Sequence, residues 1–162
     1  MEPVCYVDRL NARYRSQGFP AYRWTVNDDA PLCRLGRPLG EATVSLLTSG
    51  GVSQSCAAPW DADARNDFRL DEIPADVLGD SFQVHDSYYD TADASRDINC
   101  VFPVDRLREL AAEGAVGAVA DRLWSGFMGR IYKRSYTTDV AAPAFVEALR
   151  HDGVDLVVLA PA

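Results

Sequence analysis

The sequence lacks the features that mark several large classes of protein. It has no apolar run approaching the ~18 residues that a transmembrane helix needs. Its first residues lack the apolar core of a signal peptide, so the cytoplasm is the expected location. Basic residues are few: 16 Lys and Arg against 24 Asp and Glu give a net charge of −8. This balance argues against nucleic acid or an anionic membrane as a partner, because both require a basic face.

Cysteine and histidine are also sparse. The two histidines and the four cysteines are scattered, with no C-x-x-C pair and no zinc-ligand spacing, so we expect free thiols and no metal site. No cysteine pair can both attack a substrate and resolve the adduct, so we expect no catalytic nucleophile within these residues. Cys100 stands beside Val101 and Phe102, which predicts a buried, inert thiol.

The composition that remains is that of a globular domain. Apolar residues make up 48% and charged residues 25% of the 162 residues, enough to bury a core. We expect a single α/β domain over 1–162. Within it, 1–41 would hold an N-terminal helix and an irregular segment, and 42–162 would form the core.

Periodicity and turn signals predict alternating strands and helices. Short apolar runs predict strands at 42–49, 82–85, 115–120 and 154–159, and helical spacing predicts helices at 3–17, 103–114 and 139–151. The stretches 53–72 and 121–137 are predicted to be surface loops. The order predicts a parallel, layered α/β sheet of the flavodoxin or Rossmann-like kind.

The last predicted strand bears on function. Val154–Leu159 is apolar on both faces, which predicts a central strand. Ligands of open parallel sheets bind outside the carboxyl ends of the strands, in the loops that follow. Because the sequence stops at that loop, we expect an incomplete copy of a longer domain.

The polar stretch 85–103, HDSYYDTADASRDINCVFP, is the main candidate for a binding loop. Asp90, Asp93 and Asp97 could orient a cationic amine or accept a proton. The alternatives are a solvated loop with Asx-turns and a helix cap, or a hard-cation site, although the glycine and closing Glu of a calcium loop are missing.

Other polar residues near these strand ends have two interpretations each. His85 could shuttle protons or simply cap a strand. Asn99 is expected to brace the loop through backbone hydrogen bonds. Ser49, Gly50 and Gly51 could cradle a carboxylate with backbone N–H groups, or form a tight turn that needs glycine.

Several of these pieces together resemble one family. They are TSGG after the first strand, the His…Tyr-Asp loop, the Asp-x-Asn-x-Val-Phe-Pro-x-Asp-Arg-Leu start of a helix, and the final HDGVDLVVL. Over 42–162 the chain resembles the B-component (selenoprotein B) family of glycine, sarcosine, betaine and D-proline reductases. One departure is that the family histidine stands four residues before the Tyr-Asp aspartate, whereas His85 stands five before Asp90.

The resemblance implies a reductase subunit that cleaves a C–N bond of an amino acid or related amine. A selenocysteine or cysteine would attack the α-carbon, and a second thiol of a Sec/Cys-x-x-Cys motif would resolve the adduct. That motif would follow Ala162, so a UGA read as a stop would end the chain there. The substrate-binding residues implied are His85, Tyr89, Asp90, Asp93, Asp97, Asn99, Ser49, Gly50 and Gly51.

The resemblance also implies partners, and a second function is open. It implies no cofactor in this chain, a pyruvoyl group on a partner subunit, and a thiol reductant; a homo-oligomer is a further expectation. The alternative is a naturally short, non-catalytic binding or assembly module that uses the acidic loop at 85–99.

Overall fold

The computed structural model describes residues 5–21, 28–29 and 33–162, which form parts of two compact units, Met1–Arg34 and Leu35–Ala162. In the first unit, helix α1 (Tyr6–Ser16) buries no side chain and ends just before Gly18, whose φ is 82°. The helix predicted over 3–17 is confirmed from Tyr6 onward. Residues 3–4 and part of the predicted irregular segment, 22–27 and 30–32, lie outside the described residues. The single domain with a division after residue 41 stays a prediction.

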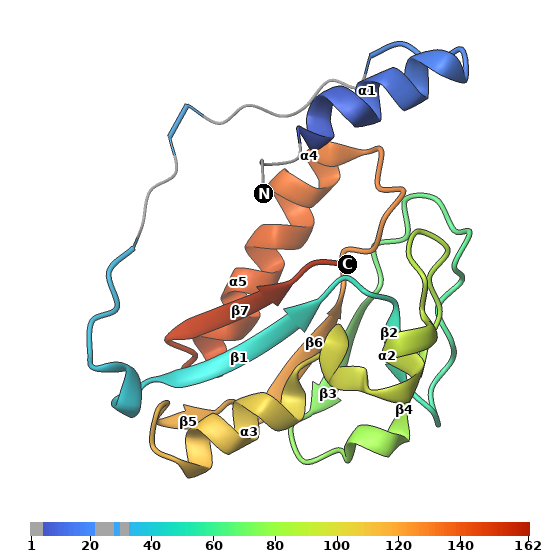
Figure 1. Ribbon diagram of the computed structural model, residues 1–162. Helices are drawn as coiled ribbons and strands as arrows, with labels where there is room; N and C mark the ends of the chain where they lie inside the picture. Colours follow the sequence, from blue (N-terminus) through green and yellow to red (C-terminus); the bar gives the residue numbers. More distant parts are fainter. Residues whose placement is uncertain (1–4, 22–27, 30–32) are drawn as a thin grey trace. The chain divides into compact units, whose positions relative to one another are not determined.

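The second unit is built around strand β1 (Figure 1). On one side β1 pairs in parallel with β5 near its start and with β6 near its end, and on the other side it pairs in parallel with β7. Strand β3 pairs with β6 in antiparallel fashion. The bounds are β1 Thr43–Thr48, β3 Leu70–Pro74, β5 Ala118–Val119, β6 Arg122–Gly126 and β7 Leu156–Ala160. The predicted α/β layered fold with a mostly parallel sheet is confirmed.

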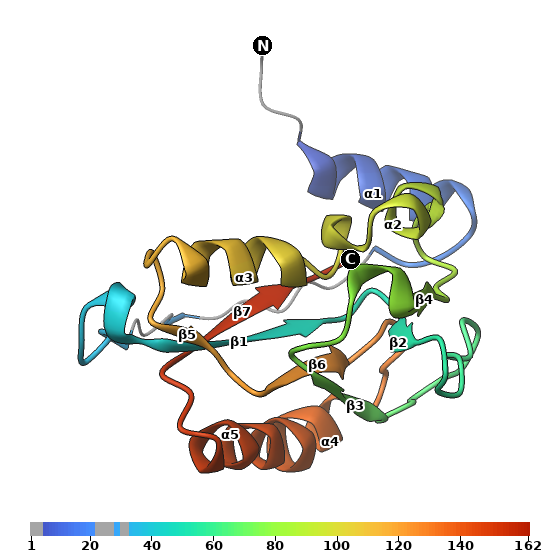
Figure 2. The same cartoon turned by 90° about the horizontal axis from the view of Figure 1, so that it is seen from below.

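Helices cover the two faces of this sheet (Figure 2). Helix α3 (Val104–Ala112) lies on one face, and α5 (Ala142–His151) lies on the other, preceded by α4 (Arg134–Tyr136) and the π turn η4 (Thr137–Ala141). Successive side chains of β1 point to opposite faces. Leu46 accordingly packs in the α3-side core, and Leu47 packs with Trp124 and Phe145 in the α5-side core.

A smaller sheet lies beyond the carboxyl end of β1. Its strands β2 (Val52–Gln54) and β4 (Phe82–Val84) are antiparallel. The polar stretch 85–103 follows β4 and includes the short helices α2 (Ala92–Arg96) and η3 (Ile98–Cys100). Two further 3-10 turns are η1 (Leu39–Glu41) and η2 (Gly79–Ser81).

Several sequence predictions of secondary structure need correction. The segment 121–137, predicted to be a loop, contains the interior strand β6, and the predicted loop 53–72 contains the end of β2 and the start of β3. Arg122, at the start of β6, contributed to the wrong prediction of a loop, because a charged residue is uncommon in an interior strand. Here the guanidinium is paired with Glu72 and Asp152, each at 2.7 Å. The strand predicted at 82–85 exists, but in the small antiparallel sheet.

Strand β7 is the most consequential correction. Its apolar pattern predicted a central strand, whereas among the described residues it pairs with β1 alone and lies at an edge. Leu156, Val158 and Leu159 are 39%, 39% and 61% exposed. The prediction that Cys100 is buried is also wrong: all four cysteines are exposed, and all four are free thiols, as expected. No helix in the described parts of the chain is long and apolar enough to cross a membrane.

Candidate functional site at the carboxyl ends of β1 and β7

The turn that follows β1 is tied to the end of β7. The Ser49 N–H donates to the Ala160 carbonyl at 3.2 Å, and the Ala162 N–H donates to Ser49 Oγ at 3.3 Å. The Gly50 N–H donates to Thr48 Oγ1 at 3.1 Å. The carboxyl ends of two neighbouring parallel strands therefore form one connected structure, at the sheet edge where α/β proteins bind ligands.

The surroundings of both glycines in this turn leave little room for a side chain. A Cβ on Gly50 would lie 3.2 Å from Ala162 Cβ, from Tyr89 Oη and from Val101 Cβ. Gly51 has φ +65°, and a Cβ there would lie 2.2 Å from the His85 carbonyl oxygen. The glycines thus allow three separate segments to approach the turn closely. This agrees with the interpretation that residues 49–51 form a tight turn that needs glycine.

Tyr89 braces the turn. Its hydroxyl donates a hydrogen bond of 2.8 Å to the Gly50 carbonyl. Burial raises the pKa of the Tyr89 phenol to about 12, and the nearby negative charge of Asp86 adds to the effect. The phenol therefore remains a neutral hydrogen-bond donor throughout the physiological pH range.

His85 lies on the other side of the turn. Its backbone N–H donates to the Gly51 carbonyl at 2.9 Å. The side chain borders a polar cavity of about 480 Å³, whose lining includes Gln83, Ser95 and Arg96. The Nδ1 atom is buried and has no hydrogen-bond partner among the described residues. Buried polar atoms are normally paired, so this nitrogen is distinguished by lacking a partner within the described residues.

The acidic side chains of the loop are already engaged and do not converge on the turn. Asp90 accepts the Ala92 N–H at 3.0 Å in an Asx-turn, and Asp93 is 81% exposed and paired with Arg96. These contacts match the alternative in which Asp90 and Asp93 serve local structure. In the described part of the chain, no group of three or more His, Cys, Asp or Glu residues could hold a metal ion.

Asn99 caps the first turn of helix α3, and Asp97 caps the preceding 3-10 turn η3. Asn99 Nδ2 donates to Asp97 Oδ1 at 2.9 Å and to Asp105 Oδ2 at 3.0 Å, and Asn99 Oδ1 accepts the Asp105 N–H. The hydrogen bonds from Asn99 lower the pKa of the Asp97 carboxyl. The bracing role expected for Asn99 is what this geometry provides.

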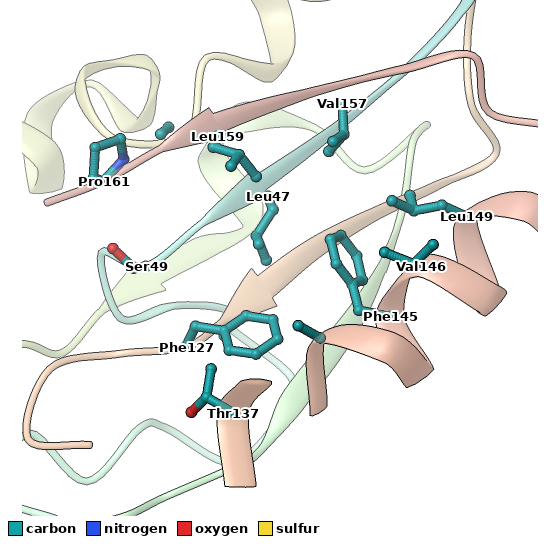
Figure 3. Close-up of a pocket in the computed structure, with 13 residues that line it drawn as sticks. Leu47, Ser49, Phe127, Thr137, Phe145, Val146, Leu149, Val157, Leu159 and Pro161 are labelled. Carbon is teal, nitrogen blue, oxygen red and sulfur yellow. The ribbon is translucent and has the colours of Figure 1, made fainter. Parts of the chain in front are cut away.

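Sequence reasoning missed an apolar groove beside the turn (Figure 3). It has a volume of about 470 Å³ and lies between the ends of β1, β6 and β7 and helix α5. Ser49 borders one end of it. Phe127, which follows β6, also borders it and adopts φ +53°, a conformation that non-glycine residues rarely take. Thr137 Oγ1 is buried without a hydrogen-bond partner among the described residues. The one sequence signal for this groove was the helical spacing of apolar residues at 139–151, since several of these residues line it.

Comparisons of the sequence with known proteins identify its family. The model of the glycine/sarcosine/betaine reductase selenoprotein B family matches residues 21–162. The chain belongs to this family, which confirms the resemblance described above. No solved structure matches the chain.

Three curated relatives are similar over part of their length. The D-proline reductase subunit gamma of Acetoanaerobium sticklandii is 35% identical over 123 residues, covering 76% of this chain and 50% of the relative. The glycine reductase complex component B subunit gamma of Carboxydothermus hydrogenoformans is 30% identical, covering 94% of this chain and 36% of the relative. The same-named protein of Symbiobacterium thermophilum is 30% identical, covering 76% and 29%. The chain thus spans half or less of the length of these relatives.

Proposed function

We propose that these residues form the substrate-side part of a selenol- or thiol-dependent reductase that cleaves a C–N bond of an amino acid or related amine. The observation that carries the proposal is the connection of Ser49, Gly50, Tyr89 and Ala162 at the carboxyl ends of β1 and β7, in a member of a reductase family. The names of the relatives, D-proline reductase and glycine reductase, support this class of substrate.

The turn would orient the substrate, and the nucleophile would follow Ala162. The selenolate or thiolate would attack the α-carbon, and the amine would leave with the electron pair of the C–N bond. A second thiol would then displace the carbon, which takes a proton, and form a bond between the two chalcogen atoms. An external dithiol would reduce that bond and leave as a disulfide. A selenol suits the first step because it is ionised at neutral pH, whereas a free thiol has a pKa near ~8.5.

The residues of the turn divide these tasks by their chemistry. The neutral Tyr89 phenol would hold the turn rather than transfer a proton, since its pKa of about 12 is far from neutral pH. His85, with its unpaired Nδ1, is the better candidate to move a proton. The family resemblance implies a pyruvoyl group on a partner subunit of the reductase complex, and we derive no step through it.

The alternative, a non-catalytic module that binds through the acidic loop, has weaker support. Asp90, Asp93 and Asp97 already accept hydrogen bonds within their own segment. These carboxylates remain exposed, so the reductase interpretation is favoured by the family match rather than by their contacts.

The test begins with the nucleotide sequence after codon 162. An in-frame UGA followed by x-x-Cys, expressed in a host that inserts selenocysteine, is expected to give dithiol-dependent release of amine or ammonia from glycine, sarcosine or betaine, or dithiol-dependent ring opening of D-proline. The 162-residue chain is expected to be inactive with the same substrates. A UAA or UAG codon at that position, or dithiol-dependent turnover by the 162 residues alone, would contradict the proposal.

In the active protein, His85→Gln would report on proton transfer. We expect it to lower kcat. The matched control is Asp93→Asn, because Asp93 lies in the same loop but is exposed. Equal effects of the two substitutions would remove His85 from the mechanism.

A further inference from the structure

Rare backbone conformations are concentrated in the loops beside the turn after β1. Among the residues that the structure describes, three residues other than glycine have a positive φ: Asn66 at 53°, Phe127 at 53° and Arg130 at 60°. Asparagine adopts such values more readily than phenylalanine or arginine. The Asn66 N–H donates to the Arg130 carbonyl at 3.0 Å, so these residues belong to one junction of loops. Strained backbone persists where surrounding contacts hold it, and it clusters at functional sites.

Two loops meet at this junction, the loop between β2 and β3 and the loop between β6 and α4. Asn66 Oδ1, from the first loop, accepts the N–H groups of Tyr132 and Lys133 at 2.8 and 2.9 Å. Arg130, from the second loop, returns the contact to Asp63. Its Nη1 donates to the Asp63 carbonyl at 3.1 Å, and its Nη2 lies 3.2 Å from the Asp63 carboxylate. The two loops are therefore joined through both backbone and side chains.

Tyr88 connects the same guanidinium to the segment between β4 and α2. Arg130 Nε donates to the Tyr88 hydroxyl at 3.0 Å, and the guanidinium carbon lies 5.2 Å from the centre of the Tyr88 ring. A Cβ on Gly129 would lie 2.9 Å from that ring, so the backbone of the β6–α4 loop also lies against Tyr88. Arg130 thus contacts two other segments at once, and its positive φ is the backbone conformation in which it does so.

The segments joined by Arg130 are those that contact the turn after β1. From the β4–α2 segment, the Tyr89 hydroxyl donates to the Gly50 carbonyl at 2.8 Å and the His85 N–H donates to the Gly51 carbonyl at 2.9 Å. From the β6–α4 loop, Met128 Cε lies 3.1 Å from the position of a Cβ on Gly51. The conformation of the turn therefore depends on how these two segments are placed relative to one another.

We propose that Arg130 is a positioning residue for the reductase reaction proposed above, on which this inference rests. Through Tyr88 it fixes the β4–α2 segment against the β6–α4 loop, and these two segments fix His85 and the turn. Arg130 itself touches neither the substrate nor the reacting atoms. Its effect is expected on rate rather than on binding, because a displacement of about 1 Å caused by a remote substitution can cost on the order of 100-fold in rate.

Positioning and stability can be measured separately at this junction. The side chain of Asp63 is 77% exposed and Tyr88 is 57% exposed. Exposed contacts of this kind contribute little to the free energy of unfolding. Loss of the Tyr88 hydroxyl should therefore leave the unfolding temperature nearly unchanged and still alter the turn, whereas a merely structural role would not separate the two effects.

The first measurement is amide hydrogen exchange of the 162-residue chain. Arg130→Asn removes the guanidinium and keeps a residue that tolerates positive φ. The amides of Gly50 and His85, which donate within the turn, should exchange about 10-fold faster, as expected for loss of a hydrogen bond to a charged group. Arg65→Asn is the matched control, because Arg65 is an exposed arginine of the β2–β3 loop, and it should change neither amide.

Tyr88→Phe decides the question if Arg130→Asn does not fold. It keeps the ring and removes the acceptor of the Arg130 hydrogen bond, so the same two amides should exchange faster at an unchanged unfolding temperature. Unchanged exchange in the folded variants, or equal acceleration by Arg65→Asn, would overturn the inference.

The second measurement uses the active protein extended beyond residue 162. Arg130→Asn is expected to lower kcat by about 10- to 100-fold and to leave KM nearly unchanged. A raised KM at unchanged kcat would instead assign Arg130 to substrate binding and overturn the positioning role. An extended wild type without reductase activity would refute the proposed function and with it the role in catalysis, whereas unchanged amide exchange in an active enzyme would refute this inference alone.

Discussion

The Tyr89 hydroxyl offers a direct measure of how strongly the turn after β1 is held. Tyr89→Phe removes the 2.8 Å hydrogen bond to the Gly50 carbonyl and keeps the aromatic ring. Gly50 is buried, so its carbonyl loses this donor in a place that water reaches poorly. An unsatisfied buried acceptor costs about 1–3 kcal/mol, so we expect the free energy of unfolding to fall by about 2 kcal/mol.

Thermal unfolding followed by circular dichroism measures the effect. For a chain of this size, about 2 kcal/mol corresponds to a Tm lower by roughly 4–8 °C. The control is Tyr88→Phe, because Tyr88 is 57% exposed and its hydroxyl accepts a hydrogen bond from Arg130 at the surface. We expect that change to stay within about 0.5 kcal/mol. If the two variants unfold at the same temperature, the hydroxyl of Tyr89 does not brace the turn.

Two further predictions concern the turn and the opposite end of the sheet. Gly51→Ala should destabilise the protein far more than Gly114→Ala. A Cβ on Gly51 would lie 2.2 Å from the His85 carbonyl oxygen, whereas Gly114 also has a positive φ, +74°, but no atom within 4 Å of its Cβ position. Chemical denaturation of both variants measures the difference in the free energy of unfolding, and equal losses would show that backbone strain alone matters. The hydrogen bond from Arg122 lowers the pKa of Asp152, so its contribution to stability is present above the unfolded pKa of ~3.9 and is lost as pH falls through the lower folded pKa. Asp152→Asn should therefore lower stability at neutral pH and flatten its acid dependence, and an unchanged urea midpoint at pH 7 would refute this.

Local sequence patterns were sufficient to predict elements whose start and stop residues lie within or beside the element. Helix α3 begins after Pro103 and ends before Gly114, whose φ of +74° matches the stop that the sequence predicts. Strand β6 could not be found in this way, because Arg122 is accommodated by carboxylates 50 and 30 residues away. Partners so distant leave no trace in a short window of sequence.

The candidate site was predictable in part for the same reason. The glycines of the turn and Tyr89 stood out as residue types, but the hydrogen bond that joins Tyr89 to Gly50 spans 39 residues. The aspartates attracted attention through their number, whereas their geometry is local and serves turns and a helix cap. The position of β7 in the sheet depends on which other strands pair with it. Its hydrophobicity alone predicted a central strand.

The ion pairs of Arg122 and the turn after β1 stabilise opposite ends of the large sheet. One guanidinium joins β3, β6 and the turn before β7 at the amino end of the large sheet, while the turn of Ser49–Gly51 lies at the opposite end. The framework is thus held by contacts remote from the candidate site. Loss of the Arg122 ion pairs is therefore expected to leave the hydrogen bond between Tyr89 and Gly50 in place, and loss of that hydrogen bond is expected to leave the ion pairs in place.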